Sequence, residues 1–209
     1  RMLLSKLEGM IAFMKVEIAA NDENVILEAS KINGRNRGYL LDIIREKPHT
    51  LSDKEEKLLS KLSPVLDTPY QVYNMTKLAD MVFPSFQVDG KEYPMGYALF
   101  EDDYQYEKNT EVRRKAFEVF SNEIKKYENT TASVYNAQCQ KEKIESEIRG
   151  YDSVFDFLLF PQNVTREMYD RQIDTIMNEL SPHMRRYARL KKKVLGLEEM
   201  TYPDLLVPL

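Results

Sequence analysis

Apolar residues recur at helical spacing over most of the chain, and the longest such pattern lies between residues 110 and 149. Thr110 precedes it as a candidate N-cap, and Glu111 follows in the first turn, where the helix dipole favours a negative charge. Gly150 is the expected end. One uninterrupted helix from Glu111 to Arg149 would be about 58 Å long. Its apolar side chains share one face, at positions 117, 120, 124, 127, 134 and 135.

Shorter patterns with the same period predict helices before this one. The first is a packing helix whose apolar positions are Leu3, Leu7, Met10, Ile11, Met14 and Ile18. Asn21 and Asp22 interrupt it, and a short helix around residues 25–29 then stops near Gly34. A third helix, closed by Pro48, is marked by Tyr39, Leu40, Ile43 and Ile44.

A fourth helix is expected to begin at a capping box, because Ser52 and Glu55 stand at the spacing at which each side chain satisfies the other residue's backbone N–H. Pro64 should bend or divide this helix, since a proline lacks the N–H and clashes with the preceding turn. The helical pattern resumes from Tyr70 to Met81.

Two helices are expected after Gly150, first a short one and then a long one. Asp152 is the candidate cap of a short helix through Phe160. The long one begins at Thr165, and its apolar stripe keeps its phase across Pro182, which favours a kink over a break. Gly196 stands where a C-cap glycine belongs.

One β-hairpin is predicted between Phe86 and Tyr93. Asp89 and Gly90 can supply the positive φ angles of a two-residue type I′ turn between alternating apolar positions. The predicted fold class is therefore all-α, mainly long antiparallel helices, with one small β-hairpin near residues 86–93.

Three segments carry a resemblance to a known family. They are R-K-A-F-E-V-F (Arg114 to Phe120), N-T-T-A (Asn129 to Ala132) and R-G-Y-D-S (Arg149 to Ser153) before an aromatic-aliphatic helix. As a set they resemble oligoendopeptidase F, a bacterial branch of the zinc metallo-oligopeptidases related to thimet oligopeptidase. The similarity runs from about Pro48 to Leu197.

The resemblance implies a mostly helical peptidase that cleaves short peptides inside a deep channel, with a zinc ion held by an H-E-x-x-H helix and a further glutamate. It implies that residues 1–209 are the amino-terminal helical region of such an enzyme, whose catalytic zinc domain is absent from this chain. Zinc is then the cofactor of the full-length enzyme, and none is expected in this fragment. A start at Arg1, inside an amphipathic segment, also suggests that an upstream part has been removed.

Composition narrows the classes of protein and partner. A net charge of −4 argues against nucleic acid, whose phosphates require a basic surface. No apolar run reaches the roughly 18 residues of a membrane span, and no signal peptide opens the chain. A single cysteine, Cys139, excludes an internal disulfide and suits a reducing compartment, so we expect a cytoplasmic protein.

The candidate reactive residues lack the partners that catalysis requires. His49 and His183 are the two histidines of the chain, and neither belongs to an H-E-x-x-H pair. Cys139 has neither a helix start nor a C-x-x-C partner to lower its pKa. No catalytic, cofactor-binding or metal-binding residue is predicted, and structural roles are favoured for all three.

Two charged runs have alternative interpretations. The acidic run Glu101 to Glu107 could attract a cation or the amino end of a peptide, but the pattern favours a solvated loop. A basic run lies near the end of the last helix and comprises Arg185, Arg186, Arg189, Lys191, Lys192 and Lys193. Its position favours a solvated helix face over a binding site for an anionic partner. Some of the thirteen tyrosines could line a peptide channel.

Two function hypotheses remain. The favoured one is the amino-terminal channel wall of a zinc oligopeptidase, inactive by itself, whose full-length form takes oligopeptide substrates. The alternative is a free-standing helical interaction module without catalysis, and an H-E-x-x-H motif downstream of Leu209 would decide between them. Apolar faces near Val134, Ile144 and Leu190 are expected to be uncovered in the fragment and to drive self-association.

Overall fold

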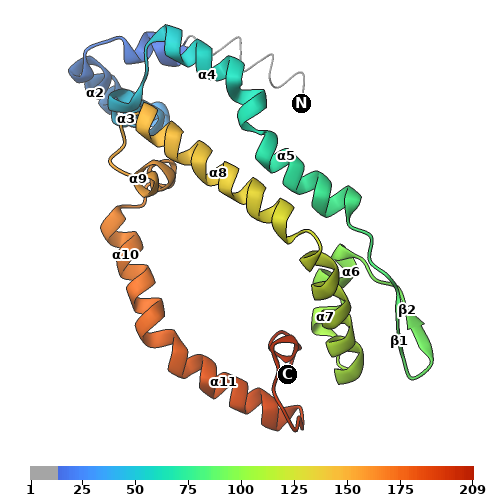
Figure 1. The fold of residues 1–209 in the computed structure, drawn as a ribbon. Coiled ribbons are helices and arrows are strands. Elements are labelled where there is room, and N and C mark those ends of the chain that lie inside the picture. The colour runs from blue at the N-terminus through green and yellow to red at the C-terminus, as the bar shows by residue number, and fades with distance from the viewer. Residues whose placement is uncertain (1–13) are drawn as a thin grey trace.

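The computed structural model describes residues 14–209 and places them in an open, mainly helical fold with one β-hairpin, as predicted (Figure 1). Helices α4 and α5 run beside α8 in the opposite direction, and α9, α10 and α11 then lead the chain round toward α7. The larger elements are α2 (Glu23–Ile32), α3 (Arg37–Glu46), α4 (Asp53–Leu66), α5 (Thr68–Met75), β1 (Phe86–Val88), β2 (Lys91–Tyr93), α6 (Tyr97–Asp102), α7 (Thr110–Lys125), α8 (Glu128–Ile148), α9 (Val154–Leu159), α10 (Arg166–Thr175) and α11 (Ser181–Val194).

Short helical turns complete the path. They are the 3₁₀ turns η1 (Gly34–Asn36), η2 (Lys47–His49), η4 (Tyr104–Tyr106), η5 (Phe160–Gln162) and η7 (Tyr202–Asp204), and the π-helical turns η3 (Thr76–Asp80) and η6 (Ile176–Leu180).

The first third of the chain follows its sequence pattern closely. A helix covers 14–19, and the remaining apolar positions of the predicted packing helix, Leu3, Leu7, Met10 and Ile11, lie outside the described residues. The expected break at Asn21 and Asp22 is confirmed, and Asp22 caps α2 by accepting a hydrogen bond of 2.9 Å from the Asn24 N–H. Helix α4 begins at the predicted capping box of Ser52 and Glu55.

Pro64 does not end the helix at its own position. It lies inside α4, which continues to Leu66 before a division at Asp67, where α5 begins. A proline removes one backbone donor from the helix, and the helix ends within a turn of it.

The single rod predicted from Glu111 to Arg149 is wrong, because two helices, α7 and α8, replace it and change direction between them (Figure 1). At the junction the N–H of Tyr127 bonds the carbonyl of Ile124, an i→i−3 bond that tightens the turn. The Tyr127 hydroxyl donates to the carbonyl of Asp80 at 2.9 Å, so a contact 47 residues away holds the turn. Apolar periodicity continues through such a turn and does not reveal it.

Two predicted N-caps are displaced by one residue. Asn109, not Thr110, caps α7, and its side chain accepts from the N–H groups of Glu111 and Val112. Ser153, not Asp152, caps α9 through the N–H of Asp156. In both pairs two adjacent residues are chemically competent caps, so the choice depends on the path of the preceding loop.

Gly150 ends α8 in the predicted way. Its φ is +68°, and the N–H groups of Gly150 and Tyr151 bond the carbonyls of Glu147 and Ser146, which is the Schellman arrangement. Gly196 closes α11 in the same way, with φ of +65°. Both glycines occupy the left-handed region that other residues avoid.

The β-hairpin packs on the main hydrophobic core. Asp89 and Gly90 both have positive φ, as a type I′ turn requires, and Phe86 pairs with Tyr93 across the strands. The buried core consists of Phe86, Phe100, Tyr104, Val112, Ala116 and Phe120. Phe100 stacks on Phe120 with ring centroids 3.9 Å apart, so this core fastens the hairpin and α6 to α7.

A buried carboxylate joins the C-terminal segment to α7. Asp204 is fully buried and accepts hydrogen bonds from Arg113, which is 1% exposed, at 2.5 and 3.1 Å, and from Arg114 at 2.7 Å. Thr201 donates to the same carboxylate through its N–H and its hydroxyl. Burial alone would raise the pKa of Asp204, but the hydrogen bonds from Arg114, Arg113 and Thr201 outweigh it and hold that pKa well below its usual range.

The fold exposes far more surface than a compact protein of its mass. Its accessible area is 15608 Å², whereas a compact monomer of 24.6 kDa exposes about 10,000 Å². Within residues 14–209, no helix is long and apolar enough to cross a membrane.

We predict that Gly150→Val destabilises the chain by about 1 to 2 kcal/mol, because a β-branched residue is strained at positive φ. No atom lies within 4 Å of the position of an added Cβ, so the cost comes from the backbone and not from a clash. Chemical unfolding of both forms measures it. Gly38→Val, at a helical glycine that is equally uncrowded and lacks a positive φ, is the control, and an equal loss in both variants would contradict the assignment.

We predict that Asp204→Asn lowers the free energy of unfolding by about 3 kcal/mol at neutral pH, since it breaks a buried ion pair. Because the folded-state pKa is depressed, the stabilisation is present above the ordinary aspartate pKa of about 4 and is lost as pH falls below it. Melting curves at several pH values should therefore converge for the two forms under acid. Asp170→Asn, which removes an exposed partner of Arg166, should change little at any pH.

Candidate functional site

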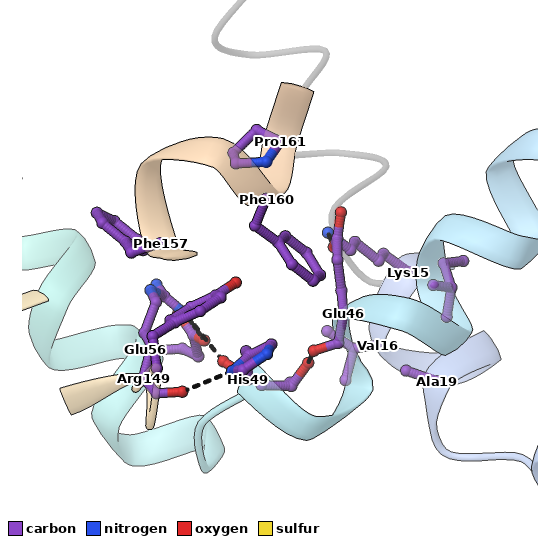
Figure 2. Close-up of a pocket in the computed structure, with 13 residues that line it drawn as sticks. Lys15, Val16, Ala19, Glu46, His49, Glu56, Arg149, Phe157, Phe160 and Pro161 are labelled. Carbon is purple, nitrogen blue, oxygen red and sulfur yellow. Dashed lines mark hydrogen bonds and ion pairs between the residues drawn. The ribbon is translucent and has the colours of Figure 1, made fainter. Parts of the chain in front are cut away.

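A cavity of about 460 Å³ lies at the corner where α8 ends, and it is the candidate site (Figure 2). The Gly150 turn, η2, the first turns of α4 and the end of α9 converge on it. We refer to His49, Glu56, Arg149, Tyr151 and Phe160 as the corner cluster. The R-G-Y-D-S segment that carries the family resemblance supplies two of its members.

His49 is fixed on three sides. Its ring stacks on Tyr151 with centroids 3.6 Å apart and planes 7° from parallel, and the Phe160 ring points toward it with centroids 5.2 Å apart (Figure 2). His49 Nδ1 lies 3.0 Å from the carbonyl oxygen of Arg149. A carbonyl only accepts, so Nδ1 carries a proton, and in the neutral imidazole Nε2 is left as an acceptor.

Arg149 and Glu56 form a two-pronged ion pair. The guanidinium nitrogens lie 2.9 and 3.2 Å from the two carboxylate oxygens, and Arg149 also donates to the carbonyl of His49 at 3.4 Å. The hydrogen bond from Arg149 lowers the pKa of Glu56, and the same bond raises the pKa of Arg149. The pair joins the start of α4 to the end of α8, which are 93 residues apart in sequence.

The far wall of the cavity is held by Arg45 of α3. Its Nη1 donates to the Phe160 carbonyl at 2.6 Å, and its guanidinium lies 4.2 Å from the centre of the Phe160 ring. Burial raises the pKa of the Tyr151 hydroxyl. Lys15 and Glu46 also line the cavity and form an ion pair with each other.

The arrangement fits a structural role, or recognition of a ligand by its shape, better than it fits catalysis. Both cations and both carboxylates that line the cavity are paired, so among the described lining residues no unpaired charge of either sign faces it. Thr50 contributes the aliphatic hydroxyl among the described lining residues, and this hydroxyl donates to the carbonyl of Glu46, not to His49. The cluster therefore lacks an activated nucleophile of the kind that a histidine base would require.

The other predicted candidates are scattered. His183 lies exposed on α11, and Cys139 lies exposed on α8. Among the residues that the structure describes, no three histidine, cysteine, aspartate or glutamate side chains come together as a metal site. The sequence did not connect His49 with Arg149 and Tyr151, since a contact across 100 residues leaves no local pattern.

The two charged runs are less solvated than expected. The acidic run includes Tyr104, which is buried and whose hydroxyl donates to the carbonyl of Pro94 at 2.6 Å. In the basic run the expectation of a solvated face fails at Lys191, which is 1% exposed and donates to the carbonyl of Leu205. Lys191 buries its stem under the C-terminal segment, whereas Arg185, Arg186, Arg189, Lys192 and Lys193 are exposed.

Comparison with known families gives two matches along the chain. Residues 17–83 match the model described as Oligopeptidase F, and residues 104–205 match the model described as Peptidase family M3. The chain is 31% identical to oligopeptidase PepF of Bacillus subtilis over 99% of its own length and 31% of that protein. It is 30% identical to an oligoendopeptidase F homolog of Borreliella burgdorferi over 80% of its length and 27% of that protein.

The fold is also that of a solved structure. The crystal structure of oligoendopeptidase-F from Enterococcus faecium superposes with a TM-score of 0.84 at 23% identity, over 99% of this chain and 41% of that one. The chain spans less than a third of the length of the Bacillus and Borreliella relatives. From the two family matches and these relatives, the chain belongs to peptidase family M3, in its oligoendopeptidase F group.

Proposed function

We propose that this chain is the amino-terminal channel-wall portion of a cytoplasmic zinc metallo-oligopeptidase that hydrolyses short peptides. The observation that carries the proposal is the uncovered arm formed by α10, η6 and α11. The relatives support it, because each is more than three times as long as the part that it shares with this chain. An arm of this kind requires a second body to pack against, and the remainder of such a polypeptide would supply one.

The arm is exposed along most of its length. Every residue from 170 to 187 is exposed, although the helix carries an apolar stripe. The stripe consists of Ile173, Ile176, Met177, Leu180, Met184 and Tyr187. Isolated amphipathic helices are marginal in water and gain most of their stability by burying the apolar face. The stripe is therefore the surface we assign to the remaining part of the polypeptide.

This chain does not supply the metal site of the proposed enzyme. Its two histidines lie on separate elements, His49 in η2 and His183 in α11. Within residues 14–209, no three histidine, cysteine, aspartate or glutamate side chains converge as a zinc site requires. Its contribution to peptide hydrolysis is shape: a rigid wall that limits which molecules reach the catalytic groups.

The alternative is a helical interaction module without catalysis, and the same exposed stripe favours it, because an apolar helix face also suits a partner protein. The two proposals differ in the sequence and activity that they require of a longer polypeptide. An H-E-x-x-H helix downstream of Leu209 together with peptidase activity supports the first, and an inactive polypeptide supports the second.

We predict that the 209-residue chain alone has no peptidase activity and holds no stoichiometric zinc, since its histidines are far from each other along the chain and share no element. Metal analysis after dialysis and a quenched-fluorescence peptide assay test this. The matched control is the longer polypeptide assayed in parallel. One zinc ion retained per chain together with peptide turnover would refute the prediction.

We predict that the isolated chain associates with itself as its concentration rises, through exposed apolar side chains of the arm. Met177 is 73% exposed and Leu190 is 52% exposed. Sedimentation over a wide concentration range should show association that Met177→Glu weakens. Asn178→Glu, at the neighbouring position of the same turn, controls for added charge, and a strictly monomeric wild-type chain would count against a covering partner for the stripe.

The other two apolar positions expected to drive association are on α8. Ile144 is 52% exposed, and Val134 is half-buried beside α5. We therefore propose Ile144 as a secondary contact and assign Val134 to a groove between α5 and α8.

A further inference from the structure

The arm formed by α10, η6 and α11 is held mainly at its two ends. Every residue from 170 to 187 is exposed, so the middle of the arm has little support from the rest of the described chain. At the α9 end, the ring centroids of Tyr169 and Phe155 lie 5.6 Å apart, and the Arg166 guanidinium lies 4.5 Å from the centre of the Phe155 ring. At the other end the chain folds back between α11 and α7 (Figure 1). We call residues 199–207 the strap.

The strap is fastened to α7 by several contacts. The Asp204 carboxylate accepts hydrogen bonds from two arginines of α7, and one of them, Arg114, also donates to the Glu199 carbonyl at 2.6 Å. The Tyr202 ring lies beside the Phe117 ring of α7, with centroids 5.5 Å apart. Because these contacts combine buried charge with ring packing, the strap and α7 behave as one unit.

The strap is joined to the arm by a lysine. Lys191 is the one buried residue of α11, and its ammonium donates a hydrogen bond to the Leu205 carbonyl. The ammonium also lies 5.3 Å from the centre of the Tyr187 ring. Among the described residues, no carboxylate forms an ion pair with it. A buried charge is costly unless it is hydrogen-bonded, so this joint depends on the bond to Leu205 far more than the α7 side depends on any one contact.

We propose that the strap is a latch that sets the position of the arm relative to α7, and that Lys191 is its releasable joint. With the Lys191 hydrogen bond in place, α11 is held to the strap and, through Asp204, to α7. When that bond breaks, the strap stays on α7, and the arm is joined to it only by the connecting backbone of residues 195–198. The inference goes beyond the proposed function and requires no catalysis.

Single-molecule fluorescence energy transfer measures the position of the arm, at a dilution that prevents association between copies. One dye is attached to Cys139, the single cysteine of the chain, which is exposed on α8, and Asn178→Cys places the second dye on η6. Lys191→Met keeps an unbranched stem and removes the donor. It should raise the ratio of released to latched molecules about tenfold, the effect of losing one hydrogen bond from a charged donor. Asp204→Asn should shift the transfer efficiency of the arm pair too, because it detaches the strap from α7.

Matched controls separate release of the arm from general unfolding. Lys192→Met changes an exposed lysine at the neighbouring position and should leave the arm pair unchanged. Moving the second dye from η6 to the β-hairpin, with Lys91→Cys, reports on the main core, and its transfer efficiency should stay constant in every variant. An unaltered arm pair in Lys191→Met overturns the latch, and so does an equal shift in Lys192→Met. Equal changes in the arm and hairpin pairs also overturn it, because the whole fold has then opened. Peptidase activity does not enter this test, so failure of the latch and failure of the proposed function are distinguishable.

Discussion

The open fold depends on one buried carboxylate. Asp204 sits between Arg113 and Arg114 and accepts five hydrogen bonds in all, so its charge is compensated although no water reaches it. Burying an ion costs several kcal/mol unless its hydrogen bonds are complete, and an incomplete set would leave the C-terminal segment detached. Through this contact the path from α8 round to α11 returns to α7, which already belongs to the main core (Figure 1).

A chain arranged in this way has few independent sets of contacts between segments that are distant in sequence. The hairpin core holds α6 and α7, the corner cluster holds α3, α4, α8 and α9, and the Asp204 contact closes the path. The corner cluster combines a charged pair with aromatic packing, since Arg149 and Glu56 lie beside the His49 stack. Little apolar area is buried between these three sets of contacts, which accounts for the large exposed surface. The arrangement of the helices therefore depends on the geometry of each set.

Sequence reasoning succeeded where the cause of a structure is local. Gly150, Gly196 and the Asp89–Gly90 turn were predicted because positive φ has a strong residue preference. It failed where a distant group decides: the Tyr127 hydroxyl reaches Asp80 at the turn that divides the predicted long helix. For the same reason the corner cluster was not assembled from sequence, although its R-G-Y-D-S segment carried the family resemblance.

The π-helical turn η6 has a consequence for how the arm can vary. It lies directly before Pro182 in the first turn of α11, and a π turn accommodates one residue more than an α turn. Each residue of an α-helix rotates it by about 100°, but the wider π turn absorbs one residue, so loss of a single residue here would restore an α turn and leave α11 facing nearly the same way relative to α10. The arm can thus lose one residue at this turn and still present Met184 and Tyr187 of α11 on the same side as Ile173 of α10.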